Sequence, residues 1–172
     1  NLISNKSEPI SKERHIIDSA QIIDFIDEND EVCTDIGSGS GLPGIVLAII
    51  MKYKKSRMTF NLYEKSYHKS NFLKEVSKKF NLNTKIFQKN IFYEKNLKTD
   101  LIVARAFKPL PIILDLVEKN FSEFKYVIVY LGKNGKEVLR GSLNKFKFEY
   151  TEKKSLTSKD SMMIKITNLK KI

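Results

Sequence analysis

The sequence has few of the residues that carry much of protein chemistry. Its 172 residues include one cysteine, two histidines, four prolines and no tryptophan. The single cysteine, Cys33, excludes an internal disulfide, and its place in an apolar stretch predicts a small buried core residue. Two histidines and one cysteine do not provide the ligand spacing of a zinc or haem site, so we expect no bound metal.

Long hydrophobic runs are also missing. The longest candidate, GIVLAII at residues 44–50, is far shorter than the ~20 apolar residues that cross a bilayer. The start of the chain has no basic stretch followed by an apolar one, which would mark a secretory signal peptide. We therefore expect no membrane partner and a cytoplasmic location.

Length and composition predict one globular domain. A chain of 172 residues suits a single sizeable core, and 41% hydrophobic residues is typical of a folded protein. No repeat, linker or low-complexity segment divides the chain. We expect one domain over residues 1–172, with a helical N-terminal part over residues 1–30, and a monomer.

The charge is unbalanced toward lysine, with 31 Lys and Arg against 20 Asp and Glu and a net charge of +11. This excess favours an anionic partner such as RNA, DNA or a membrane surface. A lysine-, isoleucine- and asparagine-rich composition is equally typical of an AT-rich genome. A basic cluster late in the chain predicts phosphate contacts, or else a solvated helix face; it comprises Lys133, Lys136, Arg140, Lys145 and Lys147.

Hydrophobic periodicity predicts alternating strands and helices. The expected helices cover residues 11–26, 43–53, 66–82, 110–121 and 134–146, and the expected strands cover residues 31–37, 58–64, 84–88, 100–106, 126–132, 147–156 and 161–169. Alternation along most of the chain predicts a mostly parallel sheet with helices on both faces. The last two strands follow each other without a helix, so an antiparallel edge is expected there.

Four of the seven glycines lie in the stretch DIGSGSGLPG, residues 35–44, between a predicted strand and a predicted helix. Such a turn lets the backbone approach a ligand, and the helix start offers free amide protons. The stretch fits both the dinucleotide pattern G-x-G-x-x-G and the pattern D-x-G-x-G-x-G of proteins that bind S-adenosylmethionine (SAM). Asp35 favours SAM, because its carboxylate would attract an ammonium group and repel a pyrophosphate. Glu64, at the end of the next strand, suits a ribose hydroxyl pair.

Two further groups of polar residues are candidate site residues. His15, Asp18 and Ser19 share one face of the first predicted helix, which either covers the ligand pocket or is solvated. Arg14, beside them, would contact phosphate or solvent. Arg105 directly follows an apolar strand, so it either points into the ligand crevice or forms a structural salt bridge with Glu64 or Asp35.

Four stretches together resemble a known family. They are RHIIDSA (14–20), DIGSGSGLPGIVLAI (35–49), EKSYHKSNFLKEV (64–76) and VARAF (103–107), and they have the order and spacing of the glucose-inhibited division protein B family. The members of that family are bacterial small-subunit rRNA guanine-N7 methyltransferases. The family usually has an additional helical segment before the position of Asn1, and that segment is absent from this sequence.

The resemblance implies an α/β, Rossmann-like class I SAM-dependent methyltransferase with a seven-stranded sheet. It implies methyl transfer from SAM to N7 of a guanine in 16S rRNA of the 30S ribosomal subunit. Cofactor-binding residues would be Asp35, Gly37, Gly39, Gly41, Leu42, Glu64, Ile91, Phe92 and Arg105. Arg105, His15 and Asp18 would form the catalytic set, and Arg14, Lys133, Lys136 and Arg140 would bind RNA.

Three alternatives stay open at this point. A SAM-dependent methyltransferase could act on another RNA or on a small molecule. A dinucleotide oxidoreductase would need a proton donor near the nicotinamide, and neither histidine stands where one is expected. A non-catalytic RNA-binding domain predicts salt-sensitive RNA binding without affinity for SAM.

Overall fold

The computed structural model describes the backbone of residues 8–172 and the side chains of residues 13–172. Its helices are α1 (Glu8–Ala20), η1 (Gln21–Phe25), α2 (Gly44–Tyr53), α3 (Tyr67–Phe80), η2 (Ile91–Tyr93), α4 (Leu110–Asn120) and α5 (Gly135–Ser142). Its strands are β1 (Val32–Ile36), β2 (Thr59–Tyr63), β3 (Thr84–Phe87), β4 (Leu97–Lys98), β5 (Leu101–Ala104), β6 (Phe121–Glu123), β7 (Tyr126–Leu131), β8 (Phe146–Lys154) and β9 (Met162–Lys171). Within the predicted N-terminal part, residues 1–7 lie outside this description.

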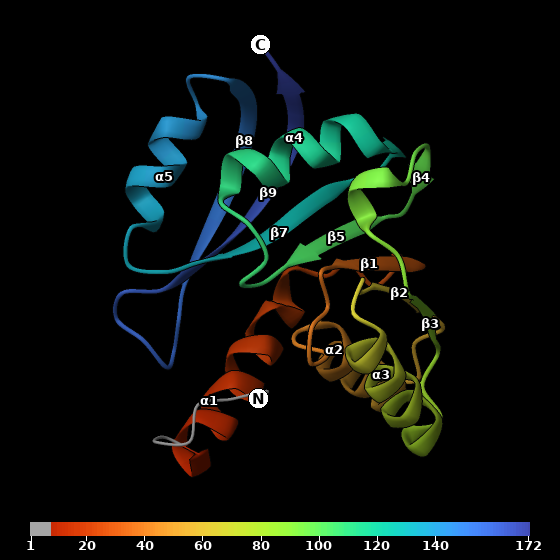
Figure 1. The fold of residues 1–172 in the computed structure, drawn as a ribbon. Coiled ribbons are helices and arrows are strands. Elements are labelled where there is room, and N and C mark those ends of the chain that lie inside the picture. The colour runs from red at the N-terminus through yellow and green to blue at the C-terminus, as the bar shows by residue number, and fades with distance from the viewer. Residues whose placement is uncertain (1–7) are drawn as a thin grey trace.

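One sheet organises the molecule (Figure 1). It has seven strands in the order β3-β2-β1-β5-β7-β9-β8. The strands from β3 to β7 pair in parallel, whereas β9 pairs antiparallel with both β7 and β8. The predicted seven-stranded, mostly parallel sheet with an antiparallel edge is therefore confirmed.

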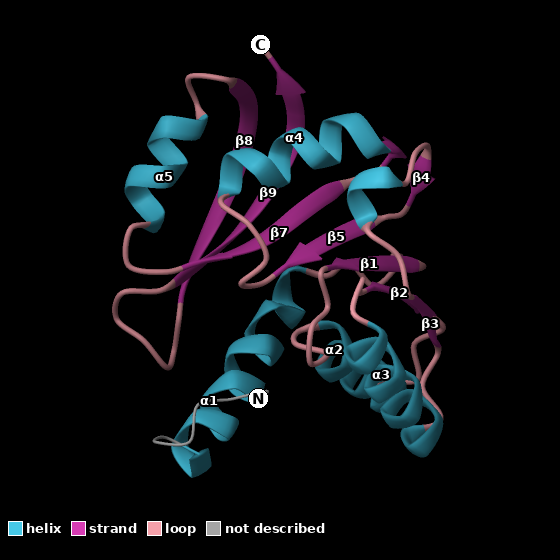
Figure 2. Ribbon diagram, in the orientation of Figure 1, coloured by secondary structure: helices cyan, strands magenta, loops and turns pink. Residues whose placement is uncertain are grey.

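Helices cover both faces of this sheet (Figure 2). Along β5, Leu101 and Val103 pack into the core shared with η1, α2 and α3, while Ile102 and Ala104 pack into the core shared with α4 and α5. Burial on both faces explains why this strand reads as a continuous apolar run rather than an alternating one. Two separate apolar cores, one on each face, fix the position of every central strand.

The predicted helix over residues 66–82 shows how local signals set helix boundaries. Ser66 accepts a hydrogen bond from the Lys69 backbone N–H at the start of α3. Asn81 follows the last turn with a φ of 48°, in the left-handed conformation that ends many helices. The helix begins and ends within two residues of its predicted bounds.

Three local details differ from the sequence prediction. The first α-helix ends at Ala20 and continues as the 3-10 turn η1, so the predicted helix to residue 26 is too long. The last helix ends at Ser142, because Phe146 is buried in the sheet and already belongs to β8. The parallel pair β4 and β6 was not predicted, since two- and three-residue strands carry too little periodicity.

The topology places a ligand crevice at the carboxyl ends of the central parallel strands. The chain passes from β1 to β2 on one side, and later crosses to β5 on the other side of β1. The loops after these strands therefore separate at their carboxyl ends, where doubly wound sheets bind ligands. No helix in the described part of the chain is long and apolar enough to span a membrane.

Candidate cofactor and substrate site

The turn between β1 and α2 has a backbone that glycine favours. Gly37, Gly39 and Gly41 have φ values of +75°, +55° and +91°, a conformation that costs other residues free energy. A Cβ atom on Gly37 would lie 2.1 Å from the Phe107 ring, whereas one on Gly39 would point into open space, with the nearest atom 3.8 Å away. Gly39 thus leaves a cradle that any larger residue would fill.

Glu64 ties this turn to the end of β2. Its Oε2 accepts a hydrogen bond of 2.9 Å from the Gly39 backbone N–H, and its Oε1 accepts one of 2.7 Å from the Ser66 backbone N–H. The Gly37 and Ser38 backbone N–H groups donate to the Tyr63 carbonyl oxygen at 3.0 and 2.9 Å. The turn and an acidic residue are therefore held beside one another, as the sequence pattern predicted.

Asp35 does not reach the cavity that this turn borders. Its Oδ2 accepts a 3.0 Å hydrogen bond from the Gly44 backbone N–H at the start of α2, and its side chain is buried. Burial raises the pKa of Asp35 to about 7. Its geometry is that of a helix-start acceptor, which corrects the expectation that this carboxylate faces the ligand.

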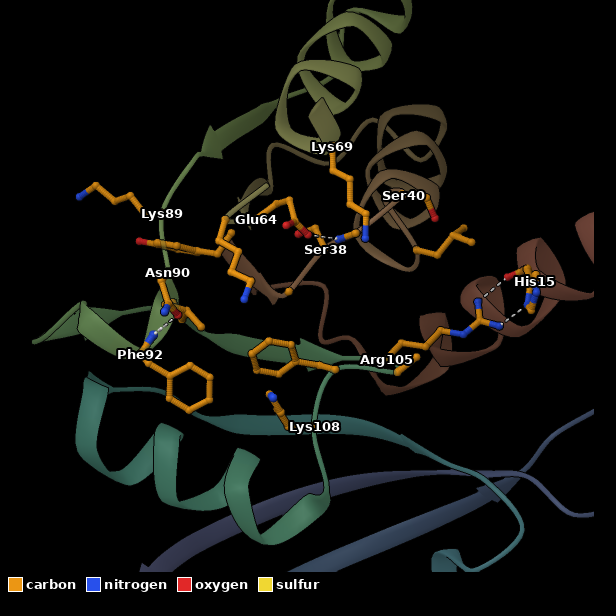
Figure 3. A pocket seen from close by; sticks show the side chains of 18 residues that line it. His15, Ser38, Ser40, Glu64, Lys69, Lys89, Asn90, Phe92, Arg105 and Lys108 are labelled. Carbon is orange, nitrogen blue, oxygen red and sulfur yellow. Dashed lines mark hydrogen bonds between the residues drawn. The ribbon is translucent and has the colours of Figure 1, made fainter. Parts of the chain in front are cut away.

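A cavity of about 670 Å³ opens along the glycine turn and the ends of β2 and β5. This volume lies in the range of pockets for small ligands and cofactors. Figure 3 shows labelled side chains around it that come from these elements, from α1 and α3, and from the segment after β3 that includes η2. Among the predicted site residues, those that line it are His15, Gly37, Gly39, Leu42, Glu64, Ile91, Phe92 and Arg105. Asp18, Asp35 and Gly41 are not part of its lining.

One end of the cavity is apolar and aromatic. Ile91 is buried, and Phe92 stacks near Phe107 with ring centroids 5.9 Å apart. The Asn90 side chain accepts a 3.2 Å hydrogen bond from the Phe92 backbone N–H, which fixes the turn η2 (Figure 3). This end offers flat apolar surface to a planar ring, while Glu64 offers a carboxylate nearer the middle.

The sequence prediction missed four lysines that line the cavity, namely Lys65, Lys69, Lys89 and Lys108. Three of them come shortly after the carboxyl ends of β2, β3 and β5, and Lys69 lies in the first turn of α3. A search for cations just beyond each parallel strand would have found Lys65, Lys89 and Lys108. Together the four lysines give the mouth of the cavity a positive charge.

Arg105 joins the end of β5 to helix α1 (Figure 3). Its Nη1 donates to the His15 carbonyl oxygen and to the Ser19 hydroxyl, both at 2.8 Å. Its Nη2 lies 2.8 Å from His15 Nδ1 and donates to Asp18 Oδ2 at 3.4 Å. These four contacts match the four hydrogens on the two terminal nitrogens. The salt-bridge interpretation of Arg105 holds with Asp18, not with Glu64 or Asp35.

The same contact sets the protonation of His15. Arginine has no acceptor, so His15 Nδ1 must accept and the ring hydrogen must lie on Nε2. Burial, and then the positive charge of Arg105, lower the pKa of His15. At neutral pH the imidazole is uncharged and presents an N–H donor.

Asp18 connects α1 to the loop between β8 and β9. Its Oδ1 accepts hydrogen bonds from Gln21 Nε2 at 2.9 Å and from the Ser155 hydroxyl at 3.0 Å, and also from the Thr157 hydroxyl. A second cavity, of about 240 Å³, lies beside this residue. It shares His15, Arg105 and Ala106 with the larger cavity.

The residues predicted to bind RNA are exposed. Arg14 lies on α1 at the smaller cavity, Lys133 follows β7, and Lys136 and Arg140 lie four residues apart on α5. Their role in RNA binding stays a prediction. The described residues contain no group of three or more His, Cys, Asp or Glu side chains arranged to hold a metal ion.

Comparison with known proteins agrees with this geometry. The family model for rRNA small subunit methyltransferase G (GidB) matches residues 1–167. A Pelagibacter ubique protein named ribosomal RNA small subunit methyltransferase G is 51% identical over 99% of this chain and 81% of that protein. A Rickettsia bellii protein of the same name is 33% identical over 100% of this chain and 86% of its own length.

A solved SAM-dependent methyltransferase from Aquifex aeolicus has the same fold. The TM-score is 0.65 at 12% identity, over 95% of this chain and 98% of that one. The sheet order, the glycine turn and the acidic residue after β2 thus belong to the class I SAM-dependent methyltransferase fold, and the family match gives the same enzyme class. Within that class, the chain belongs to the rRNA small subunit methyltransferase G family. The family resemblance, the enzyme class and the cofactor predicted from the sequence are confirmed.

Proposed function

We propose that this protein transfers a methyl group from SAM to N7 of a guanine in the 16S rRNA of the small ribosomal subunit. The observation that carries the proposal is the Gly37–Gly39 cradle joined to Glu64 beside a cavity of about 670 Å³, in a chain of this family. The positive mouth of the cavity supports an RNA substrate.

The residues present fit SAM. The open Gly39 cradle suits the close approach of a ligand to the backbone, Glu64 suits ribose hydroxyls, and Ile91 with Phe92 suits an adenine ring. SAM supplies an electrophilic methyl group on a sulfonium ion. Because Glu64 already accepts two backbone hydrogen bonds, its carboxylate is held in place before any ligand arrives.

The chemistry makes modest demands on the protein. Guanine N7 carries a lone pair in the plane of the base and has no proton to lose, so no general base is required. The neutral state of His15 agrees with this, and its Nε2–H is a donor rather than a base. The main task is alignment of the two reacting groups, which supplies ~7–11 kcal/mol in favourable cases. The network that fixes Arg105 and α1 holds one wall of the site rigid.

We propose that the chain acts as a single domain and as a monomer, in the cytoplasm, on rRNA within the 30S subunit. Arg14, Lys133, Lys136 and Arg140 would contact RNA phosphates.

The test is transfer of labelled methyl from SAM to 30S subunits lacking N7-methylguanine, with naked 16S rRNA alongside. The proposal predicts label in 16S rRNA at a site where strand cleavage specific for N7-methylguanine occurs. SAM binding without transfer to either substrate would contradict the rRNA assignment and point to another acceptor. Absence of SAM binding would contradict the cofactor as well.

A further inference from the structure

The smaller cavity lies directly beside the larger one and has its own polar group. Its volume is about 240 Å³, below the usual range of about 300–1,000 Å³ for drug-sized ligands, and it suits one planar base. Its lining includes Tyr130, Met162 and Met163, with Asp18, Arg14 and Arg105 as charged groups. Met162 and Met163 are consecutive in β9, and their side chains pack into the cores on opposite faces of the sheet. The proposed cofactor cavity lies on the other side of His15, Arg105 and Ala106.

The two oxygens of Asp18 differ in their hydrogen bonding. Oδ1 accepts from Gln21, Ser155 and Thr157. Among described residues, Oδ2 has only Arg105 at 3.4 Å and Arg14 at 3.9 Å. Asp18 is 8% exposed and lines the smaller cavity. A carboxylate oxygen of a largely buried residue, with spare acceptor capacity, is a place where a ligand donor gains a strong hydrogen bond.

We propose that the smaller cavity receives the target guanine and that Asp18 Oδ2 accepts from its N1–H and 2-amino group. This inference rests on the proposed function and names the group that reads the base. Guanine presents two donors at this edge, whereas adenine presents an acceptor at N1, which the carboxylate would repel. N7 lies on the side of the base away from the 2-amino group, so a contact between Asp18 and the N1 edge leaves N7 free.

Arg14 completes the recognition at the rim. Its side chain is 46% exposed and lies 3.9 Å from Asp18 Oδ2. A cation there suits the phosphate of the extruded nucleotide, while the buried carboxylate distinguishes the base. Arg105 is a positioning residue in this arrangement, because its terminal nitrogens already bond to α1.

The experiment uses the methionine methyl groups as reporters. Met162 and Met163 line the smaller cavity. Met163 also packs in the core around α2 that contains Met51 and Met58, and these two, which do not line the cavity, serve as internal controls. Guanosine monophosphate, inosine monophosphate and adenosine monophosphate are titrated into methyl-labelled protein and followed by NMR. The guanine nucleotide should shift Met162 and Met163 alone. Inosine lacks the 2-amino group and should bind at least severalfold more weakly, and adenosine should cause no shift.

Asp18→Asn tests the acceptor itself. Three donors at the Oδ1 position hold the amide oxygen there, so the amide nitrogen takes the Oδ2 position and presents a donor to the base. The preference for guanosine over inosine monophosphate should disappear, while SAM affinity and the control methionines stay unchanged. Ser155→Ala is the matched control, because it removes one Oδ1 contact and leaves Oδ2 as it is; it should keep the preference.

Three results would overturn the inference. They are no shift of Met162 and Met163 with guanosine monophosphate, equal shifts with the adenosine nucleotide, or an Asp18→Asn variant that keeps the guanosine preference. Failure of the proposed function appears elsewhere, as absence of methyl transfer from wild-type protein to 16S rRNA. The two failures are therefore distinguishable.

Discussion

The two sides of the proposed active site are built in different ways. The glycine turn is made of backbone: alternate residues after β1, namely Gly37, Gly39 and Gly41, have positive φ, and the turn bonds to the end of the neighbouring strand. The Arg105 network is made of side chains that come from α1, the end of β5 and the loop after β8. Contacts in that network join residues up to 139 positions apart.

This difference determines what each side can tolerate. A backbone cradle depends on the absence of side chains, so its weak points are glycines. A side-chain network depends on paired charges and donors, so its weak points are polar residues whose loss leaves a buried partner unpaired. Substitutions on the two sides should therefore separate cofactor affinity from stability.

The largest effect is expected at Gly39. Gly39→Val places a branched side chain at a φ of +55° and fills the cradle. SAM binding should become undetectable by calorimetry, while the melting temperature falls by only a few degrees. Gly141→Ala is the matched control, because a Cβ there meets no atom within 4 Å. A normal SAM titration for Gly39→Val would show that the turn does not hold the cofactor.

Asp35 makes the stability of the cofactor side depend on pH. Burial raises its folded-state pKa to about 7, above the ordinary value of 3.8. Between these values the folded state keeps a proton that the unfolded chain has lost, so the free energy of unfolding falls as pH rises. Asp35→Asn has no carboxyl group here and so removes this pH dependence of the free energy of unfolding. Its stability relative to wild type should rise by up to about 4 kcal/mol between pH 4 and 8, measured by denaturant unfolding; a constant difference would contradict the raised pKa.

Arg105 is the corresponding weak point of the network. Arg105→Ala leaves Asp18 without its closer cation and removes donors from the His15 carbonyl and Ser19. The free energy of unfolding should fall by about 3 kcal/mol, with loss of methyl transfer and a smaller change in SAM affinity. Arg57→Ala provides an exposed arginine control. Unchanged stability in urea would mean that the network does not hold α1.

Glu64 bonds to the Gly39 backbone and is proposed to bind the ribose hydroxyls. Its replacement should therefore affect SAM affinity specifically, and by less than Gly39→Val does. Glu64→Ala removes a charged acceptor next to the cradle and should weaken SAM binding by about 1–3 kcal/mol. Glu75→Ala, on the exposed face of α3, is the acidic control and should bind SAM like wild type. Equal affinities for the two variants would reject the ribose role of Glu64.

The glycine turn and the Arg105 network also differ in how far they can be predicted from the sequence. The glycine turn and Glu64 are readable because both lie in short motifs at the ends of strands. The position of Arg105 at a strand end was predictable too. Its partner Asp18 was not, because pairing across 87 positions leaves no local pattern. Asp35 was misplaced since the sequence cannot show that the α2 amide of Gly44 takes its carboxylate.

The helices and strands also divide into those that local sequence predicts and those that depend on tertiary packing. Long strands and helices with clear periodicity were predicted to within a few residues. The short pair β4 and β6 and the 3-10 turn η1 depend on tertiary packing, so they escaped prediction. The second cavity escaped it for the same reason, because its lining comes from α1, the ends of β5 and β7, and the start of β9.

The most direct test of the proposed cofactor site is a crystal structure with S-adenosylhomocysteine. We expect the ligand in the cavity of about 670 Å³, with its ribose hydroxyls bonded to Glu64, its chain against the Gly37–Gly39 backbone and its adenine beside Ile91 and Phe92. Asp35 should keep its bond to Gly44. A ligand bound elsewhere, or Glu64 turned away from the ribose, would contradict the central claim that this backbone cradle holds the cofactor.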